Sequence, residues 1–319
     1  MSRTTTGELT DDDNVGKSHS VFDHHSRFPV TGLKVGTGTL LEGAAGVKST
    51  VNDLLHFYKC FFNTCNTQTQ EASTSSKGSP FKQCPELVRG HSFLGGPYLR
   101  EQTDGLGWVR CQLLGPLGRQ GINANLDADL PVVGEGAPSR LCLYHQGLMP
   151  GSSTIVYGFP ETTTLLVETV FDDGKRNDFL RRARDSAEKS LALVPSLNSN
   201  LDSKRVPGTR PSLSLDAYRG RYFNPIKNFF IEVSLQEDSL RMNFQGLSSQ
   251  SHSLRHYHYD TFTWQMTHNE AAKRARLMVS QPPEYYLLRF GTTNDGTVDR
   301  LYWILENTHP DPETFVKET

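Results

Sequence analysis

The hydrophobic pattern of the first part of the chain predicts two amphipathic helices. Ser49 and Thr50 can each cap a helix, and from Val51 onward apolar residues recur at helical spacing. We expect this helix to end near Phe62. A second helical pattern occupies residues 177–194, where apolar residues recur about every four positions.

Short runs of β-branched and aromatic residues lie between these two helices and predict strands. The runs cover residues 105–111, 140–145, 154–159 and 163–171. A short turn at Pro160 and Glu161 separates the last two runs, so we expect these runs to form an antiparallel hairpin. The order of helix, strands and helix is typical of an α+β domain, in which helices pack on an antiparallel sheet.

Two polar segments predict the domain organisation. Residues 63–80 are rich in Thr, Ser, Gln and Asn and predict a long, exposed, mobile loop. Residues 195–211 contain three prolines among small polar residues and predict an interdomain linker. We therefore expect a first domain over residues 1–194 and a second domain over residues 212–319.

The C-terminal segment has a different texture. Apart from a short helical pattern near residues 269–274, it consists of short aromatic and β-branched runs separated by turns. These runs cover residues 229–235, 239–244, 256–265, 285–290 and 298–305. Regularly spaced short strands predict a small antiparallel β-barrel, lipocalin-like in architecture.

Composition and charge exclude several classes of protein. The chain is 36% hydrophobic and also contains 27 glycines, which is close to the globular norm and excludes wholesale disorder. Its net charge is −2 and acidic and basic residues are interspersed, which argues against nucleic acid or a membrane surface as a partner. No run of about eighteen apolar residues predicts a membrane span. The polar, acidic residues 1–13 do not resemble a secretory signal, so we expect a cytoplasmic protein.

Cysteines and histidines give no sign of a metal site. The five cysteines are odd in number and lack CxxC spacing, which predicts free thiols in a reducing compartment. Histidines cluster with Asp23 at residues 19–25 and again at His256 and His258, but neither cluster has a third ligand at a standard spacing. Gly36–Gly38 lacks the lysine of a phosphate loop. We therefore predict neither a metal nor another cofactor.

Three stretches in combination resemble the serine β-lactamase-like superfamily, which comprises class C β-lactamases, DD-peptidases and related esterases and acyltransferases. Residues 44–55 (AAGVKSTVNDLL) resemble a helix start of that family, and residues 105–108 (GLGW) resemble a strand that follows it. Residues 144–153 (YHQGLMPGSS) resemble the segment in which H-x-G replaces the K-T-G of classical members. Residues 218–224 (YRGRYFN) resemble the opening of a small β-barrel domain that often follows such hydrolases. The fungal members are the most similar in texture.

The resemblance implies a fold, a reaction and site residues. The fold would be an antiparallel sheet with flanking helices, followed by the barrel. The reaction would be hydrolysis or transfer of an acyl group from a small-molecule ester or amide through an acyl-serine, and the fungal members imply a substrate of secondary metabolism. His145 would face the site, Gly147 would allow close backbone approach, and the Leu148 N–H would be an oxyanion donor.

The sequence departs from the family where catalysis is concerned. The family's Ser-x-x-Lys and Tyr-x-Asn normally precede the stretches found here, and residues 1–4 already resemble a segment that follows them. We therefore expect the chain to begin in the middle of the family domain and to be impaired or inactive alone. Ser186–Lys189 and Tyr222–Asn224 match the two motifs literally, but their settings predict a solvated helix face and a packed strand. Cys60 and Cys142 are interpreted as buried thiols rather than nucleophiles.

Two alternatives to a hydrolase remain open from the sequence. The chain could be a non-enzymatic module that binds a ligand or a protein partner. It could also be a fragment without a stable fold, because loss of the helical part would expose the apolar face of the sheet. Convergence of a serine, a lysine and a tyrosine near His145 would favour the hydrolase.

Overall fold

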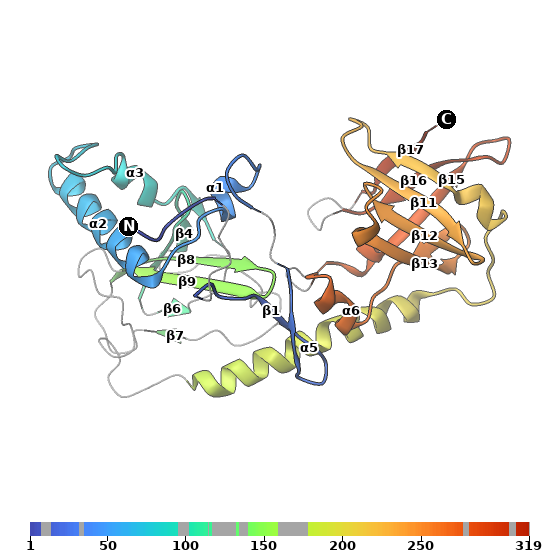
Figure 1. Ribbon diagram of the computed structural model, residues 1–319, viewed down its shortest axis with the longest axis horizontal. Coiled ribbons are helices and arrows are strands. Elements are labelled where there is room, and N and C mark those ends of the chain that lie inside the picture. The colour runs from blue at the N-terminus through green and yellow to red at the C-terminus, as the bar shows by residue number, and fades with distance from the viewer. Residues whose placement is uncertain are drawn as a thin grey trace. The chain divides into compact units, whose positions relative to one another are not determined.

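The computed structural model describes two compact units (Figure 1). The described residues are 1–7, 14–31, 35–94, 102–113, 115–116, 132–133, 140–158, 178–276, 281–305 and 311–318. Unit 1 comprises residues 1–190 with 272–278, and unit 2 comprises residues 191–271 with 279–319. The fold is α+β, as the sequence predicts, with antiparallel sheets, helices and a C-terminal eight-stranded antiparallel barrel.

Unit 1 is built on a five-stranded antiparallel sheet with the strand order β3-β4-β5-β8-β9. The strands are β3 (Ser92–Phe93), β4 (Gln102–Asp104), β5 (Val109–Gln112), β8 (Leu141–Met149) and β9 (Ser152–Gly158). Two further pairs are β1 (His19–Val21) with β2 (Arg27–Pro29), and β6 (Gly115–Pro116) with β7 (Val132–Val133).

One strand prediction in this unit differs from the structure. Residues 105–108 form a turn rather than the start of a strand, because the Gly105 N–H donates to the Trp108 carbonyl at 2.6 Å. Strand β9, predicted over residues 154–159, pairs with β8. Residues 163–171 lie outside the described residues, so their predicted hairpin with β9 stays a prediction.

Helix α2 (Val51–Gln70) begins where the sequence predicts. The Thr50 side chain accepts a hydrogen bond from the Asp53 N–H at 3.2 Å, which satisfies a donor that the first helical turn leaves unpaired. The short helices α1 (Glu42–Ala45) and α3 (Cys84–Val88) flank it in sequence.

The end of α2 corrects the prediction of a loop over residues 63–80, because the helix continues to Gln70. The Thr64 hydroxyl donates to the Cys60 carbonyl at 2.8 Å, within the helix itself. The buried Gln68 amide donates to the Phe81 carbonyl at 3.0 Å and accepts from the Cys84 N–H at 2.9 Å. Polar composition predicted exposure here, whereas these side chains find their partners inside the unit.

The sheet of unit 1 separates two small cores. One face carries Val109, Cys111, Leu113, Cys142 and Tyr144. The other face carries Leu143, packed against Phe61, Phe62, Cys65 and Cys84 from α2 and α3. Successive residues of β8 therefore alternate between the two cores, as the strand period requires.

Unit 2 is a closed barrel in which β10 pairs with β17 and every neighbouring pair is antiparallel. Its strands are β10 (Gly220–Phe223), β11 (Phe230–Gln236), β12 (Ser239–Phe244), β13 (Ser251–His258), β14 (Thr261–Thr263), β15 (Leu287–Thr292), β16 (Val298–Trp303) and β17 (Glu313–Lys317). All five predicted runs lie at these strands. The packed strand predicted at Tyr222–Asn224 lies at β10. The sequence analysis missed β17, which pairs with β10 to close the barrel, and the first half of β13. Helix α6 (His268–Lys273) lies at the predicted short helical pattern.

Helix α5 (Phe179–Lys204) corrects part of the predicted linker, because it continues through Pro195 to Lys204. Leu201 is buried, and its carbonyl accepts a hydrogen bond from the Tyr257 hydroxyl at 2.6 Å. The Asn198 side chain donates to the Met266 carbonyl at 2.9 Å. These contacts hold the last turns of α5 to the barrel, so residues 195–204 are helical. The domain boundary itself stays a prediction.

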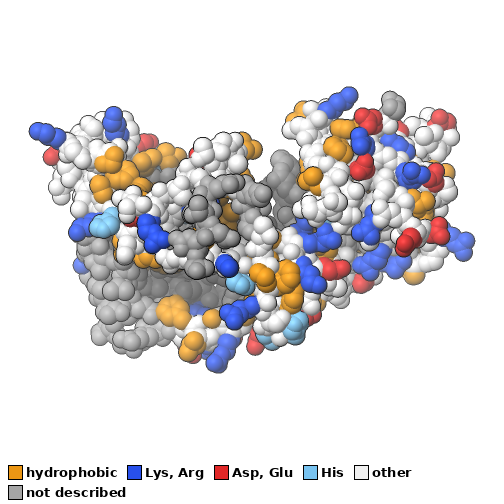
Figure 2. All heavy atoms as spheres, viewed as in Figure 1, with side chains coloured by type: hydrophobic (Ala, Val, Ile, Leu, Met, Phe, Trp, Pro, Cys, Tyr) orange, Lys and Arg blue, Asp and Glu red, His pale blue; other side chains and the backbone are white. Residues whose placement is uncertain are grey.

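No helix in the described part of the chain is long and apolar enough to cross a membrane. Figure 2 shows basic and acidic side chains interspersed over the visible surface of unit 2.

Candidate functional site

The β8–β9 hairpin emerges from the core of unit 1 at His145. Leu143 is fully buried under α2, but His145, two residues further on the same face of β8, is exposed. Its neighbour across the hairpin is Val156, and the next pair toward the turn is Gly147 with Thr154. The strip of sheet between His145 and the turn is therefore accessible to a ligand.

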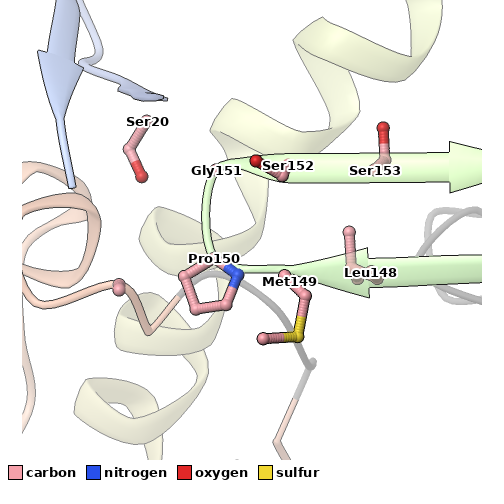
Figure 3. Close-up of a pocket in the computed structure, with 8 residues that line it drawn as sticks. Ser20, Leu148, Met149, Pro150, Gly151, Ser152 and Ser153 are labelled. Carbon is pink, nitrogen blue, oxygen red and sulfur yellow. The ribbon is translucent and has the colours of Figure 1, made fainter. Parts of the chain in front are cut away.

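A pocket of about 230 Å³ lies at the turn of this hairpin (Figure 3). Its lining includes Ser20, Leu148, Met149, Pro150, Gly151, Ser152 and Ser153. Three of these residues carry hydroxyl groups and two are large and apolar. The pocket therefore offers hydrogen bonds beside an apolar surface, which suits a small neutral ligand.

The segment that leads into β1 crosses the tip of the hairpin. The His19 N–H donates to the Gly151 carbonyl at 3.1 Å, and the Ser18 and Ser152 hydroxyls are 2.7 Å apart. Gly151 has φ +69°, and a Cβ atom there would lie 2.6 Å from the His19 nitrogen. Both the turn and the close approach of this segment thus require glycine at position 151.

The structure brings only one of the three predicted site residues into this pocket. Leu148 contributes to the lining, whereas His145 and Gly147 lie on the other face of β8. The His145 side chain makes no hydrogen bond or ion pair with a described residue, whereas its backbone pairs with Val156. A Cβ atom at Gly147 would lie 2.5 Å from Thr154 Oγ1, so glycine here makes room for the side chain across the hairpin.

Ser18 and Ser20 are the site residues that sequence reasoning missed. They lie more than a hundred residues before the hairpin, in a segment that carries no recognisable motif. The Pro150-Gly151 pair was the one signal available, since this dipeptide favours a tight turn. The crossing of β1 over that turn depends on tertiary packing.

The literal matches to the catalytic motifs lie elsewhere. Lys189 is exposed on α5, with Ser186 half-buried one turn earlier. Tyr222 is fully buried in β10, where its hydroxyl donates to the Tyr218 carbonyl at 2.7 Å. Burial raises the pKa of Tyr222 above its usual range. Neither match belongs to the β8–β9 site.

The turn between β1 and β2 holds a hydrogen-bonded chain of three side chains. His24 Nδ1 lies 3.0 Å from Asp23 Oδ1, and His24 Nε2 lies 2.6 Å from the Ser26 hydroxyl. The order of groups is that of a serine–histidine–aspartate relay. However, the His24 and Asp23 side chains are 63% and 62% exposed, so water competes for both contacts.

Four of the five cysteines are buried free thiols, and Cys60 is exposed. A hydrogen bond with Cys111, together with burial, raises the pKa of Cys142. Burial also raises the pKa of Cys65. These two thiols are therefore protonated at neutral pH and are poor nucleophiles. The exposure of Cys60 differs from the buried position that the sequence predicted.

The described ranges contain no group of three or more His, Cys, Asp and Glu side chains placed to hold a metal ion.

Residues 204–318, from the last residue of α5 to the end of the barrel, match the family described as "Domain of unknown function (DUF3471)". A search of curated proteins finds no significant match. Among solved structures, an octameric penicillin-binding protein homologue from Pyrococcus abyssi is similar at 12% identity with a TM-score of 0.32. That alignment covers 99% of this chain but only 56% of the other. At this identity and TM-score, the likeness assigns no activity to the chain.

Proposed function

We propose that the chain is a relative of the β-lactamase-like serine hydrolases and acyltransferases whose unit 1 binds a small-molecule ester or amide along β8. The observation that carries this proposal is the exposure of His145 on β8. Leu143, two residues earlier on the same face of the strand, is buried. The ordered GLGW and HQG stretches support the proposal, because they lie on the turn before β5 and on β8, which are adjacent in one sheet.

Each of the three residues has a proposed role. His145 donates a hydrogen bond to the acyl group or its leaving atom. Gly147 keeps the strand surface low enough for the substrate to approach the backbone. The Leu148 N–H polarises the acyl carbonyl, because a fixed backbone donor stabilises the charge that develops on that oxygen.

We propose further that the chain alone does not form an acyl-serine. Acyl transfer requires a serine whose proton is taken by a neighbouring base. Among the described residues, Ser18 and Ser152 beside the hairpin turn bond to each other rather than to a lysine or histidine. The chain would therefore bind acyl compounds without turning them over, and a natural-product ester is a candidate by analogy.

A fluorophosphonate serine probe tests the missing nucleophile. We expect intact mass spectrometry of the folded chain to show no stoichiometric adduct. A single adduct would contradict this part of the proposal, and peptide mapping would name the serine. An adduct at Ser26 would assign activity to the β1–β2 turn instead.

A stable amide tests the binding surface. We expect phenylacetamide to shift the NMR signals of the His145 ring and of the Leu148 amide. His145→Ala should weaken binding, whereas His56→Ala, which removes an exposed histidine from α2, should leave it unchanged. Shifts confined to unit 2, or equal binding by both variants, would contradict the proposed site.

A further inference from the structure

The barrel has a second pocket, of about 430 Å³, at the end where β11 turns into β12. This volume is within the range of small-molecule sites. Its lining comes from the last turn of α5, the turn at residues 236–239, and strands β12 to β14. All of these elements belong to unit 2.

The floor of this barrel-end pocket is apolar. Leu240 and Leu254 are directly paired across β12 and β13, and Phe262 follows on β14. Leu240 and Phe262 are each only 1% exposed. Below them the barrel is filled, because the Phe262 ring contacts the rings of Tyr218 and Phe290 at 5.3 and 5.7 Å. A ligand would therefore rest on this floor rather than enter the barrel.

The rim carries two arginines, and each side chain makes one hydrogen bond that leaves other N–H donors available. Arg205 Nε donates to the Tyr257 carbonyl at 3.1 Å, and Arg255 Nη2 donates to Gln265 Oε1 at 3.0 Å. A guanidinium has five N–H donors. The remaining donors of both side chains have no partner among the described residues. Each contact holds one edge of a guanidinium and leaves the other edge available to a ligand.

Two aspartates on the same rim favour a cationic ligand, whereas the arginines favour an anionic one. Asp202 lies 3.5 Å from the Gln265 amide, and Asp238 is exposed in the β11–β12 turn. Charges of both signs are also interspersed around this unit (Figure 2). We favour an anion, since a guanidinium is weakly hydrated and its planar fork matches a carboxylate. Beside an apolar floor, pairing a ligand carboxylate with an arginine therefore costs less desolvation free energy than pairing a ligand ammonium group with an aspartate.

We propose that the barrel-end pocket binds a small monocarboxylate with an apolar body. The apolar body contacts Leu240, Leu254 and Phe262, and the carboxylate pairs with Arg205 and Arg255. Binding makes and breaks no covalent bond. The site is independent of the acyl-binding surface proposed on β8, which belongs to unit 1.

Calorimetric titration of the full chain carrying His145→Ala, which weakens the amide binding proposed on β8, tests the charge preference with three ligands of one shape. The ligands are 4-phenylbutyrate, 4-phenylbutanamide and 4-phenylbutylamine. We expect the carboxylate to bind at least about tenfold more tightly than the amide. A hydrogen bond between charged groups raises the affinity by about that factor relative to a neutral one. Equal affinities, tighter binding of the amine, or no binding of the carboxylate at millimolar concentration would overturn the proposal.

Two arginine variants test the rim. Arg205→Met and Arg255→Met should each weaken carboxylate binding about tenfold and leave amide binding nearly unchanged. Arg300→Met is the matched control, because Arg300 lies on β16, outside the pocket lining, and pairs with Asp299 at 2.5 Å. Unchanged carboxylate affinity in both pocket variants would overturn the assignment.

A third variant tests the location without altering the buried floor. Ser239 is exposed at the start of β12 and lines the pocket, so Ser239→Trp should obstruct it. We expect loss of carboxylate binding with a cooperative melt retained. His145→Ala should leave carboxylate binding unchanged, which separates this site from the one on β8. Full affinity in Ser239→Trp would place the ligand elsewhere and overturn the proposal.

Discussion

The two units bury their apolar residues in different ways. Unit 2 closes its sheet, so its interior is a single space filled by large rings such as Phe244, Trp264 and Trp303, which contact one another at 5.2 to 6.2 Å. Unit 1 has an open sheet with a small core on each face, and cysteines contribute to both cores. A closed barrel leaves no unpaired edge, whereas an open sheet depends on other elements to cover it.

This difference explains where each unit can bind a ligand. The barrel interior is occupied, so its pocket lies at one end, above Leu240 and Phe262. In unit 1 the cover provided by α2 stops before His145, so the accessible surface is a strip of the sheet itself. The packing of each unit therefore determines the form of its candidate site.

The largest expected effect comes from the ring cluster of the barrel. Trp303 is 3% exposed, and its indole N–H donates to the Tyr285 carbonyl at 2.7 Å. Trp303→Ala would remove most of these ring contacts and leave the partly buried Tyr285 carbonyl with one donor fewer. We expect a loss of about 3–5 kcal/mol in the free energy of unfolding of unit 2. Denaturant unfolding followed by ¹⁹F NMR of fluorotryptophan-labelled protein would measure it, because Trp264 reports on the barrel.

The matched variant in unit 1 is Trp108→Ala. Trp108 is only half-buried, stacked on Phe61 at 5.5 Å. We expect a smaller loss, confined to unit 1. If the two substitutions cost the same, the contrast between one continuous core and two small cores would be wrong.

The next effect concerns a carboxylate that joins the start of the barrel to β14. Asp260 accepts hydrogen bonds from the Tyr218 hydroxyl and from both the N–H and the hydroxyl of Ser212. Burial raises the pKa of Asp260, but these donors outweigh burial and hold its pKa below the usual value. Asp260→Asn should cost about 1.5–3 kcal/mol, as expected for hydrogen bonds to a charged group.

The same shift predicts the pH dependence of unit 2. Because the folded pKa of Asp260 lies below its unfolded pKa of about 3.9, the stabilisation is complete above that pH. It is lost as the pH falls through the folded pKa. Acid unfolding of Asp260→Asn should therefore be less steep than that of the parent. Asp299→Asn is the control, since Asp299 pairs with Arg300 at the surface and its removal should cost little. An unchanged acid slope in Asp260→Asn would contradict this role.

The same contrast between the units explains which features the sequence could predict. In the barrel, residues alternate between the interior and the surface, as in β12 with Leu240, Met242 and Phe244 buried. Period-two alternation is a local signal, and all five predicted runs lie at barrel strands. The short closing strand β17 was missed because only one of its residues, Phe315, is buried.

In unit 1 the decisive contacts are long-range. Gln68 and Thr64 were predicted as loop residues because of their polarity. Both are buried, and their side chains bond to the Phe81 carbonyl and the Ser79 hydroxyl, more than ten residues away. The predicted helix start at Thr50 was confirmed because capping is a local interaction. The pairing of Ser18 with Ser152 spans most of the unit and has no local signal. The sequence therefore singled out Leu148 as a backbone donor, which stays a prediction, and did not indicate Ser20, which lines the same pocket.

The smallest effect tests how closely α2 packs on the sheet. Gly158 ends β9, opposite Leu143, and a Cβ atom there would lie 2.0 Å from Phe62 Cζ. Gly158→Ala would force α2 or β9 to shift, and such overpacking costs about 1–3 kcal/mol. Thermal unfolding of unit 1, followed by ¹⁹F NMR at Trp108, would measure the loss.

Two further variants separate close packing from a general effect of replacing glycine. Gly43→Ala in α1 places its Cβ atom in open space, so it should leave the stability unchanged or raise it slightly. Phe62→Leu shortens the side chain that the new methyl group would strike. Combined with Gly158→Ala, it should restore part of the loss, so the two changes should be non-additive. Strictly additive free-energy changes would mean that Phe62 of α2 does not contact β9 at Gly158. The end of the cover by α2 would then not explain why His145 is exposed.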